Sequence, residues 1–495
     1  MSMDKQRAPL YEALATHAGL SAHAFHVPGH KQRVAREDDD AAGFYRTLLQ
    51  LDVTELADTD DLHHPQGAIV EAQKLAAQCF GAEETSLLVG GSTSGNLAMI
   101  LGTSSPGDVF IVQRNVHKSI IHGLMLAGAR AVMLAPQFES MSGLAVIPSL
   151  SSMEAALERY PDASGIILST PNYYGMTVSL ERIVQLAHRR SVPVLVDEAH
   201  GAHLGFHDAF PESALRAGAD VVVQSTHKML SAMTMGAMLH MQGNLVDREA
   251  VKQALRMVQS SSPSFPILAS IDLARRQLHT SGSTLFEPAL EAVRVVIESL
   301  NETPFRAIGY GAHKNDSIQY DPLKLVLFDE SGKLSGARLR DELAARNCIA
   351  EMADDRYVVL ALGPGSNEAD GIALRDALFE LASISRHLPE VPEAELSPTN
   401  PNGGVTRLDQ DAAVPEPVTF RRDRLSVRTV RLTNSVGLTA GEWVIPYPPG
   451  IPVLYPGEVI TSDTIEQLVL WRNSGAQIQG AQDEALEHIV VQGEC

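Results

Sequence analysis

The chain has 495 residues, of which 44% are hydrophobic and 20% charged, a composition typical of a globular protein with more than one domain. Its formal net charge is −21 and its acidic residues are spread along the sequence, which argues against a nucleic-acid partner and is compatible with a cationic substrate. The three cysteines are far apart and the N-terminus opens no apolar segment, so we expect a cytoplasmic protein without a disulfide framework, signal peptide or membrane span.

Short apolar runs alternate with helical patterns between about residue 85 and residue 241. Seven of these runs are expected to be strands: 86–89, 109–112, 131–134, 165–168, 192–196, 221–223 and 235–241. Strands that alternate with helices indicate parallel pairing through right-handed crossovers. We therefore predict an α/β fold with a mainly parallel seven-stranded sheet flanked by helices. In such sheets ligands bind beyond the carboxyl ends of the strands.

A loop rich in glycine and hydroxyl side chains, residues 90–96, follows the first of these strands and opens a helix. Free N–H groups at a helix start bind anions, so the loop is a candidate phosphate site in which Gly91, Ser92 and Thr93 take part. The alternative is an ordinary glycine turn with a hydroxyl cap. The loop lacks the Gly-Lys-Ser/Thr ending of a nucleotide-binding P-loop.

His117 follows the second strand, at the same end of the predicted sheet. An imidazole ring at this position could stack on the ring of an aromatic cofactor. A helix-capping or core histidine is the alternative.

Two ionisable residues follow two later strands of the sheet. Asp197 ends the run that begins at Val192, and Lys228 closes the run that begins at Val221. A lysine can bind the aldehyde of pyridoxal phosphate as an imine, and a carboxylate can keep the pyridine nitrogen of that cofactor protonated. The alternative for Lys228 is a side chain that reaches the surface from a strand end. Together with the candidate phosphate loop, the pair predicts a pyridoxal phosphate site.

Two other interpretations of the segment after Asp197 are rejected. Asp197-Glu198-Ala199-His200 has the letters of a helicase box, but the chain has neither a nucleotide loop nor a basic surface. A metal site would need three convergent ligands, but His200, His203 and His207 follow a strand, so their spacing cannot be taken as that of one helix face, and we predict no metal.

The remaining sequence predicts further domains. A smaller α+β region has strand candidates at 324–328 and 357–362, and a stretch rich in Pro and Asn precedes a last segment. The predicted divisions are an N-terminal arm (1–30), a large cofactor-binding domain (31–295), a small α+β domain (296–390), a linker or exposed loop (391–417) and a C-terminal domain (418–495).

With these features in place, the sequence resembles the short form of the Orn/Lys/Arg decarboxylase family, which has the aspartate aminotransferase-like fold type I of pyridoxal phosphate enzymes. The resemblance covers essentially the whole chain, and its motifs occur in the order of the family. The matching segments are His26–Lys31, Asp52–Glu55, Asp60–His63, Gly90–Asn96, Arg114–Ser119, Pro171–Gly175, Asp197–Gly201, Ser225–Lys228, Tyr447–Pro452 and Pro456–Glu458.

The resemblance implies a role for each matching residue of the site. It implies that Lys228 forms the imine and that Asp197 pairs with the pyridinium, while His117 stacks on the ring. His200 lies near the ring and His227 beside the imine. The implied phosphate ligands are Gly91, Ser92, Thr93 and Ser225.

The resemblance also bears on assembly. The long forms of the family carry an N-terminal receiver-like domain that supports large rings, whereas this chain starts almost directly at His26–Lys31. Since the family builds its active sites at subunit interfaces, a dimer or tetramer is expected.

The implied reaction is α-decarboxylation of a basic amino acid, with Lys228 or His227 as the proton donor to Cα. Arginine, giving agmatine for polyamine biosynthesis, is preferred over lysine or ornithine by analogy with other short forms. An aminotransferase or other lyase on the same fold is an alternative, in which Arg356 would bind the substrate carboxylate. A non-catalytic homologue is disfavoured because Lys228 and Asp197 are both present.

The distal cation of such a substrate requires a carboxylate. The candidates are Glu55, Asp60, Asp61 and Glu458, each of which could equally be an ordinary loop acid.

Overall fold

The structure, a computed structural model, describes residues 4–20, 22–35, 42–385, 414–420, 426–447, 451–473 and 477–493. The predicted linker 391–417 lies almost entirely outside the described residues, as do Pro448–Gly450 of one matching segment. The chain divides into two compact units. Unit 1 comprises residues 1–103, 195–208 and 212–285, and unit 2 comprises residues 104–194, 209–211 and 286–495.

Unit 1 contains Asp197, at the end of a strand, and Lys228, just after the next strand of the sheet. Its helices are α1 (Pro9–Ala18), α2 (Ala42–Leu51), α3 (Ala68–Phe80), α4 (Gly91–Thr103), α8 (Thr226–Met229), α9 (Arg248–Val258) and α10 (Phe265–Ser281), with the 3-10 helix η1 (Gly282–Leu285). Its strands are β1 (Glu84–Leu88), β6 (Val194–Asp197), β7 (Val221–Gln224) and β8 (Ala237–Met241).

The strands of unit 1 are hydrogen-bonded in the order β1-β8-β7-β6. β6 and β7 are parallel, with Asp197 opposite Val223, whereas β8 is antiparallel to both of its neighbours. Every residue of β6, β7 and β8 is buried, which explains why these strands are continuous apolar runs rather than alternating ones.

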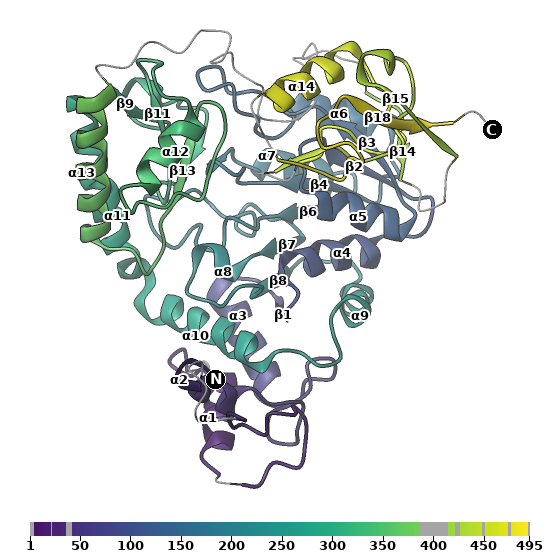
Figure 1. Ribbon diagram of the computed structural model, residues 1–495. Helices are drawn as coiled ribbons and strands as arrows, with labels where there is room; N and C mark the ends of the chain where they lie inside the picture. Colours follow the sequence, from purple (N-terminus) through teal and green to yellow (C-terminus); the bar gives the residue numbers. More distant parts are fainter. Residues whose placement is uncertain are drawn as a thin grey trace. The chain divides into compact units, whose positions relative to one another are not determined.

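Helix α4 lies against these strands, between them and α9 (Figure 1). A Cβ atom at Gly95 would lie 2.7 Å from Cγ1 of Val223, and one at Gly102 would lie 2.5 Å from Cα of Val251 on α9. The two glycines therefore allow a close approach of α4 to the sheet on one side and to α9 on the other, which fixes the start of α4 at the sheet edge.

Unit 2 contains the remaining elements. Its helices are α5 (Lys118–Ala127), α6 (Leu150–Arg159), α7 (Glu181–His188), α11 (Glu287–Ser299), α12 (Gly336–Ala344), α13 (Glu368–Ser385) and α14 (Ser462–Asn473), with η2 (Leu300–Glu302), η3 (Gly311–His313) and η4 (Leu432–Asn434). Its strands are β2 (Val109–Gln113), β3 (Arg130–Leu134), β4 (Gly165–Ser169), β5 (Met176–Thr177), β9 (Phe305–Ala307), β10 (Gln319–Tyr320), β11 (Lys324–Asp329), β12 (Met352–Ala353), β13 (Val358–Ala361), β14 (Val418–Thr419), β15 (Val427–Arg431), β16 (Ile445–Tyr447), β17 (Gln477–Gln479) and β18 (His488–Gln492).

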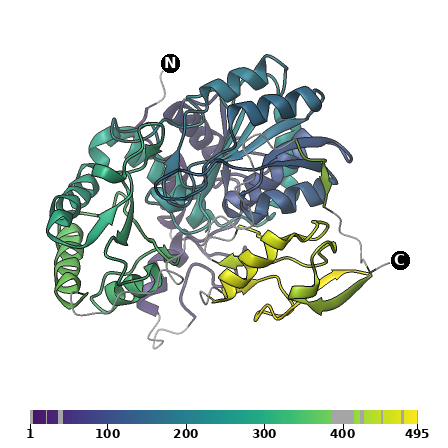
Figure 2. The same cartoon turned by 90° about the horizontal axis from the view of Figure 1, so that it is seen from above.

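The strands of unit 2 form several groups. β4, β2 and β3 are parallel neighbours, and β14 pairs antiparallel with β3. A four-stranded antiparallel sheet, β12-β13-β11-β9, packs with α11 and α13 around an apolar core that includes Phe305, Leu327 and Leu378. The two helices run side by side, shown in teal and green in Figure 2. The pairs β15–β18 and β16–β17 surround a separate core with α14.

The predicted α/β class is confirmed, because each of the seven expected strands is present. β14 is an additional strand that was not predicted; it is only two residues long and too short to leave a pattern in the sequence. No helix of the described residues is long and apolar enough to cross a membrane.

Candidate active site

Asp197 and Lys228 follow two neighbouring strands at the same edge of the sheet in unit 1. Asp197 is the last residue of β6, and Lys228 lies on the short helix α8, which begins just after β7. Since β6 and β7 are parallel, their carboxyl ends lie next to each other. The predicted meeting of these two segments is therefore present in the structure.

The amine of Lys228 contacts a histidine. Its Nζ lies 3.1 Å from Nε2 of His200, whose side chain is buried. His200 belongs to the segment that follows β6, so the contact joins the continuations of the two strands. The imidazole nitrogen can accept a proton of the lysine ammonium.

The Asp197 carboxylate is buried and held by two neutral donors. Its Oδ2 accepts a hydrogen bond of 2.9 Å from Nδ2 of Asn96, and its Oδ1 accepts one of 3.2 Å from the backbone N–H of Ala199. Burial raises the pKa of Asp197, against the opposing effects of the Lys228 charge and of these two hydrogen bonds. A cation placed beside this carboxylate would favour its ionised form.

Asn96 was not predicted as a functional residue. In the sequence it is the end of the glycine-rich loop, whereas the structure places it on α4 with a fully buried side chain that donates to Asp197. The available signal was its spacing from Ser92, since residues four apart on a helix share a face.

The candidate phosphate loop forms the start of α4. Gly91 is the first helical residue, and its φ of +69° is a conformation that favours glycine. Its N–H donates to the carbonyl of Met235, 2.9 Å away, so this N–H is already engaged. Ser92 and Thr93 follow in the first turn, where helical N–H groups have no partner within the helix.

The segment before Lys228 contributes two further hydroxyls. The side-chain oxygens of Ser225 and Thr226 are buried, and neither has a hydrogen-bond partner in the part of the chain that the structure describes. A buried hydroxyl without a partner is unfavourable, and an anionic oxygen ligand would satisfy it.

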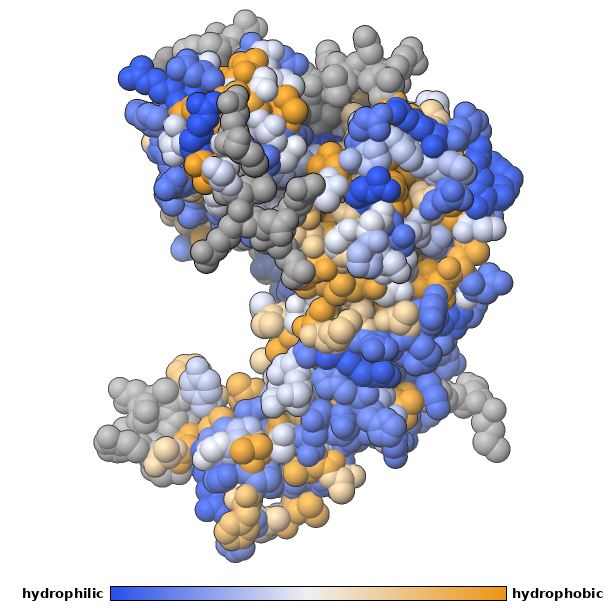
Figure 3. Space-filling model, turned by 90° about the vertical axis from the view of Figure 1, so that its right-hand side faces the viewer, coloured by the Kyte–Doolittle hydropathy of each residue, from blue (hydrophilic) through white to orange (hydrophobic). Residues whose placement is uncertain are grey.

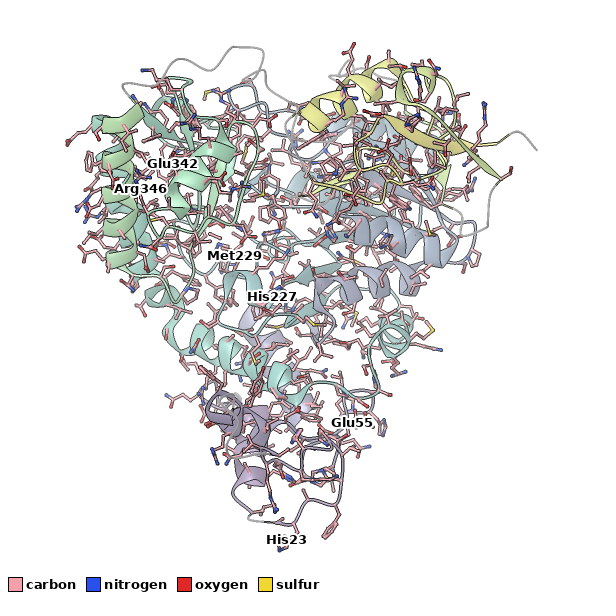
Figure 4. The ribbon with its side chains drawn as sticks, in the orientation of Figure 1. His23, Glu55, His227, Met229, Glu342 and Arg346 are labelled. Atoms are coloured by element: carbon pink, nitrogen blue, oxygen red, sulfur yellow. The ribbon has the colours of Figure 1, made fainter. Side chains whose placement is uncertain are left out.

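His227 is anchored by the segment that precedes β8. Its Nδ1 donates to the carbonyl of Gly236, 2.9 Å away, and burial lowers the pKa of the ring. Figure 4 labels His227 and, two residues further on, Met229 on α8. With Nδ1 protonated, the neutral ring has Nε2 as its free acceptor.

Together these residues fit pyridoxal phosphate. A lysine amine, a buried carboxylate held by neutral donors, a helix start and the Ser225 hydroxyl are the groups that an aldehyde, a pyridinium nitrogen and a phosphate require. The structure thus brings Asp197, His200 and Lys228 together, with the α4 start packed against β7.

His117, by contrast, belongs to unit 2. It is the N-cap of α5, where its Nδ1 accepts a hydrogen bond of 3.2 Å from the backbone N–H of Ser119. The capping role that the sequence left open is therefore present. Stacking of His117 on a cofactor ring stays a prediction.

All four candidates for the distal carboxylate accept hydrogen bonds within the chain. Glu55 accepts one from the backbone N–H of Leu62, and Asp61 accepts one each from those of His63 and His64. Asp60 accepts hydrogen bonds from four backbone N–H groups between Asp61 and Ile69, and so fixes the turn that precedes α3. Glu458 accepts hydrogen bonds of 2.9 and 3.0 Å from Nη2 of Arg114. Glu55 and Asp61 lie close enough for Asp61 to help burial raise the pKa of Glu55.

Arg356, the candidate for binding a substrate carboxylate in an aminotransferase, packs on aromatic rings within unit 2. Its guanidinium carbon lies 5.0 Å from the ring centroid of Phe328 and 5.4 Å from that of Tyr357.

Unit 1 has a cavity of about 450 Å³ that is not lined by the candidate cofactor residues. It is lined by β1, α3 and α9, including Lys74, Glu84 and Arg256. None of the predicted cofactor residues borders it.

Comparison with known proteins agrees with this geometry. The sequence profile of the Orn/Lys/Arg decarboxylase major domain matches residues 8–370, and that of the C-terminal domain of the same family matches residues 406–484. An uncharacterised Bacillus subtilis protein, YaaO, is 40% identical over 95% of this chain and 96% of its own. A B. subtilis arginine decarboxylase is 33% identical over 99% of this chain and 98% of its own.

The fold is also that of a solved decarboxylase. Lysine decarboxylase A from Pseudomonas aeruginosa superposes with a TM-score of 0.80 at 21% identity, covering 98% of this chain and 80% of that one. With the family profiles matching most of its length, this chain belongs to the Orn/Lys/Arg decarboxylase family, whose members are pyridoxal phosphate-dependent amino acid decarboxylases.

Proposed function

We propose that this protein decarboxylates arginine to agmatine and carbon dioxide, with Lys228 and Asp197 as the residues that hold pyridoxal phosphate. The observation that carries the proposal is the position of these two residues at adjacent ends of parallel strands in a chain of this family. Arginine is preferred because the relatives named arginine decarboxylase are 32–33% identical, whereas those named lysine decarboxylase are 22–26% identical.

Each residue of the site has a proposed task. Lys228 holds the cofactor covalently and is exchanged for the substrate amine. Asp197, oriented by Asn96 and Ala199, keeps the ring nitrogen protonated. The proposed phosphate ligands are Ser92, Thr93 and Ser225. Gly91 shapes the turn before them, because its own N–H is donated to Met235. His117 is proposed to stack on the ring.

Proton transfer is assigned to the residues around α8. Pyridoxal phosphate, when bound, draws electrons from the bond to the substrate carboxylate. His200, 3.1 Å from Lys228, can take a proton from the lysine and return it. Lys228 or His227 then delivers a proton to Cα after carbon dioxide has left.

A product assay tests the reaction. The purified enzyme, loaded with cofactor, is given arginine, lysine or ornithine, and carbon dioxide and the amine product are measured. The fastest release is expected from arginine, with agmatine as the product. Release from none of the three would contradict the proposal, and formation of a keto acid would instead indicate an aminotransferase.

We also propose that the protein self-associates as a dimer or tetramer with shared active sites. Five apolar or aromatic side chains near the N-terminus have exposed fractions between 54% and 94%: Leu20, Phe25, Val27, Phe44 and Tyr45. Figure 3 shows hydrophobic side chains at the surface of this region, at the foot of the view. Exposure of this kind favours a protein partner.

Light scattering tests the association. Phe25→Asp combined with Phe44→Asp is expected to lower the molar mass of the particle, and a wild type that is monomeric would contradict the proposal.

Cys79 and Cys348 are free thiols, which supports a place in the reducing cytoplasm.

A further inference from the structure

Glu198, the residue directly after Asp197, is a buried carboxylate that is not among the proposed cofactor ligands. Only 1% of it is exposed. It accepts hydrogen bonds from the Ser213 hydroxyl at 2.9 Å, from the Ala214 backbone N–H at 2.7 Å and from Nε2 of Gln224 at 2.6 Å. Its side chain also packs over Gly201, where a Cβ atom would lie 2.5 Å from its Cγ.

The contact with Gln224 joins two strand ends. Gln224 is the last residue of β7 and Glu198 is the first residue after β6, so their bond lies one step beyond the last paired residues, Asp197 and Val223. The backbone N–H of Glu198 also donates to the carbonyl of Val223, 2.9 Å away. The residues that follow these two strand ends lead to His200 and Lys228.

Gln224 continues the contact across the sheet. Its Oε1 lies 3.2 Å from Nε2 of His240 on β8, and Nδ1 of His240 lies 2.8 Å from the hydroxyl of Thr85 on β1. Thr85 and His240 are directly opposite each other in the β1–β8 pair. The side chains of Thr85, His240, Gln224 and Glu198 therefore form one hydrogen-bonded row that runs from β1 through β8 and β7 to the residue after β6, and we call it the cross-sheet row.

The donors of the cross-sheet row all point toward Glu198. Because Nε2 of Gln224 donates to the carboxylate, its Oε1 must accept from Nε2–H of His240. Nδ1 of His240 is then unprotonated and accepts from the Thr85 hydroxyl. Burial lowers the pKa of His240 to about 3, so the ring is neutral and can hold this tautomer.

Glu198 receives neutral donors only. Burial raises its pKa to about 7, and the three opposing contributions are the hydrogen bonds from Ala214, Gln224 and Ser213. Among the described residues, no charged side chain contributes to this shift. Burying a carboxylate without a cation beside it lowers the stability of the fold, so stability does not explain the presence of Glu198 at this position.

We propose that Glu198 is a positioning residue of the cofactor site: through Gln224 it holds the ends of β6 and β7, and with them Asp197 and Lys228, at a fixed spacing. The inference rests on the roles proposed for Asp197 and Lys228. A cofactor bound at one end by Lys228 and at its ring nitrogen by Asp197 requires that spacing, whereas the fold alone tolerates small displacements of a strand end. Disrupting the cross-sheet row should therefore weaken cofactor binding itself, in addition to any effect on the chemical step.

The test is cofactor binding by the apoprotein, measured as the absorbance change on titration with pyridoxal phosphate. Gln224→Met keeps the volume of the side chain and removes both of its hydrogen bonds. Gln224→Asn keeps the amide but is too short to reach Glu198 and His240 at once. Each variant is expected to weaken binding by about tenfold, the effect of losing a hydrogen bond to a charged group.

An exchanged pair provides the rescue. In Glu198→Gln combined with Gln224→Glu, the new amide at 198 donates to the new carboxylate at 224, which also accepts from His240. Ala214 still donates to the amide oxygen, and the Ser213 hydroxyl can turn to accept. This double variant is expected to recover most of the affinity, and one that binds as weakly as Gln224→Met would contradict the proposal.

Two control variants separate positioning from general effects. Leu14→Ala removes apolar volume from the buried side of α1, so it should lower the unfolding temperature of the apoprotein without changing cofactor affinity. Glu212→Gln makes the same chemical change as Glu198→Gln at an exposed position and should behave as the wild type.

Wild-type affinity in Gln224→Met, or an equal loss of affinity in Leu14→Ala, would overturn the inference. No substrate is present in these titrations, so their outcome does not depend on which amino acid is decarboxylated. A failure of the proposed cofactor site itself would be visible separately, as a wild-type absorbance band that persists in Lys228→Ala.

Discussion

Nδ2 of Asn96, near the start of α4, donates a hydrogen bond of 2.9 Å to Oδ2 of Asp197 at the end of β6. Both side chains are buried, so the bond couples the helix that begins with the candidate phosphate loop to the carboxylate proposed to face the pyridine nitrogen. The phosphate end and the ring end of the site are thus linked through one amide.

Removing this amide is expected to weaken cofactor binding. In Asn96→Ala, Asp197 keeps only the Ala199 N–H as a donor, and the pKa of Asp197, already raised by burial, rises further. We expect about tenfold weaker binding of pyridoxal phosphate, measured by titration of the apoprotein. Asn96→Asp, which places a second carboxylate against Asp197, should bind pyridoxal phosphate more weakly than Asn96→Ala does. Stronger binding by Asn96→Asp than by Asn96→Ala would contradict the role assigned to Asn96.

Gly95→Ala is expected to displace the start of α4. The added methyl group would lie 2.7 Å from Cγ1 of Val223 and 2.9 Å from Cδ1 of Leu88, so the helix must move away from the sheet. We expect a loss of roughly 1–3 kcal/mol in the free energy of unfolding, together with weaker cofactor binding. Urea denaturation of the apoprotein measures the first effect.

Gly43→Ala is the matched control for this variant. A Cβ atom at Gly43 meets nothing within 4 Å, and the residue lies in α2. The control should be neutral or slightly stabilising, because alanine restricts the unfolded chain. If Gly95→Ala were equally harmless, the packing of α4 on β7 would not position the loop.

The stability of the apoprotein should depend on pH through Glu198. The folded-state pKa of this carboxyl, about 7, lies above its ordinary value of 4.5, so the folded state binds the proton more tightly than the unfolded state. Stability from this group is therefore fully present below pH 4.5 and is lost as the pH rises to 7.

Glu198→Gln removes this titration. Between pH 5 and pH 8 the wild-type free energy of unfolding should fall by up to about 3 kcal/mol more than that of Glu198→Gln. Urea denaturation at a series of pH values measures the difference, with Glu212→Gln expected to follow the wild type. Parallel curves for wild type and Glu198→Gln would mean that Glu198 does not titrate in this range.

Arg114 is expected to hold the C-terminal part of unit 2. Its buried guanidinium donates to the carbonyls of Pro452 and Val453 at 3.0 and 2.9 Å and to Glu458, and it lies 4.5 Å from the ring centroid of Tyr455. Arg114→Met removes the charged donor from all three acceptors and leaves the buried Glu458 without its cation, so we expect a loss of about 3 kcal/mol in the free energy of unfolding.

The control for Arg114→Met is Arg428→Ala at an exposed position of β15, which should change stability by less than about 0.5 kcal/mol. Limited proteolysis of Arg114→Met should show earlier cleavage within residues 426–493. Equal stability and equal cleavage in the two variants would contradict the role of Arg114.

Not every well-formed ion pair contributes this much to the free energy of unfolding. Glu342 on α12 and Arg346, two residues past the end of that helix, are labelled in Figure 4 and form a pair of 2.9 Å at a spacing of four residues. Pairs at this spacing contribute only a few tenths of a kcal/mol.

The strands and the candidate loop were predictable because their signals are local. Buried strands are continuous apolar runs, and a glycine-rich turn before a helix is visible within a few residues. Asp197 and Lys228 could be related because the parallel pairing of consecutive strands follows from the pattern.

The remaining features depend on contacts between distant segments. Asn96 contacts Asp197, and Thr85 contacts His240, only after the sheet has formed. Glu458 contacts Arg114 although the two residues are 344 positions apart in the sequence. Neither the engagement of Glu458 nor the cross-sheet row leaves a sequence pattern, because each partner has an ordinary polar side chain in its own segment. The short strand β14 escaped prediction for a different reason, its length.

The most direct test of the central claim is the identification of the lysine that binds the cofactor. The enzyme loaded with pyridoxal phosphate is reduced with borohydride and digested, and the peptides are analysed by mass spectrometry. We predict a single stable adduct on the peptide that contains Lys228, absent from Lys228→Ala. An adduct on another lysine, with none on Lys228, would contradict the assignment of the active site.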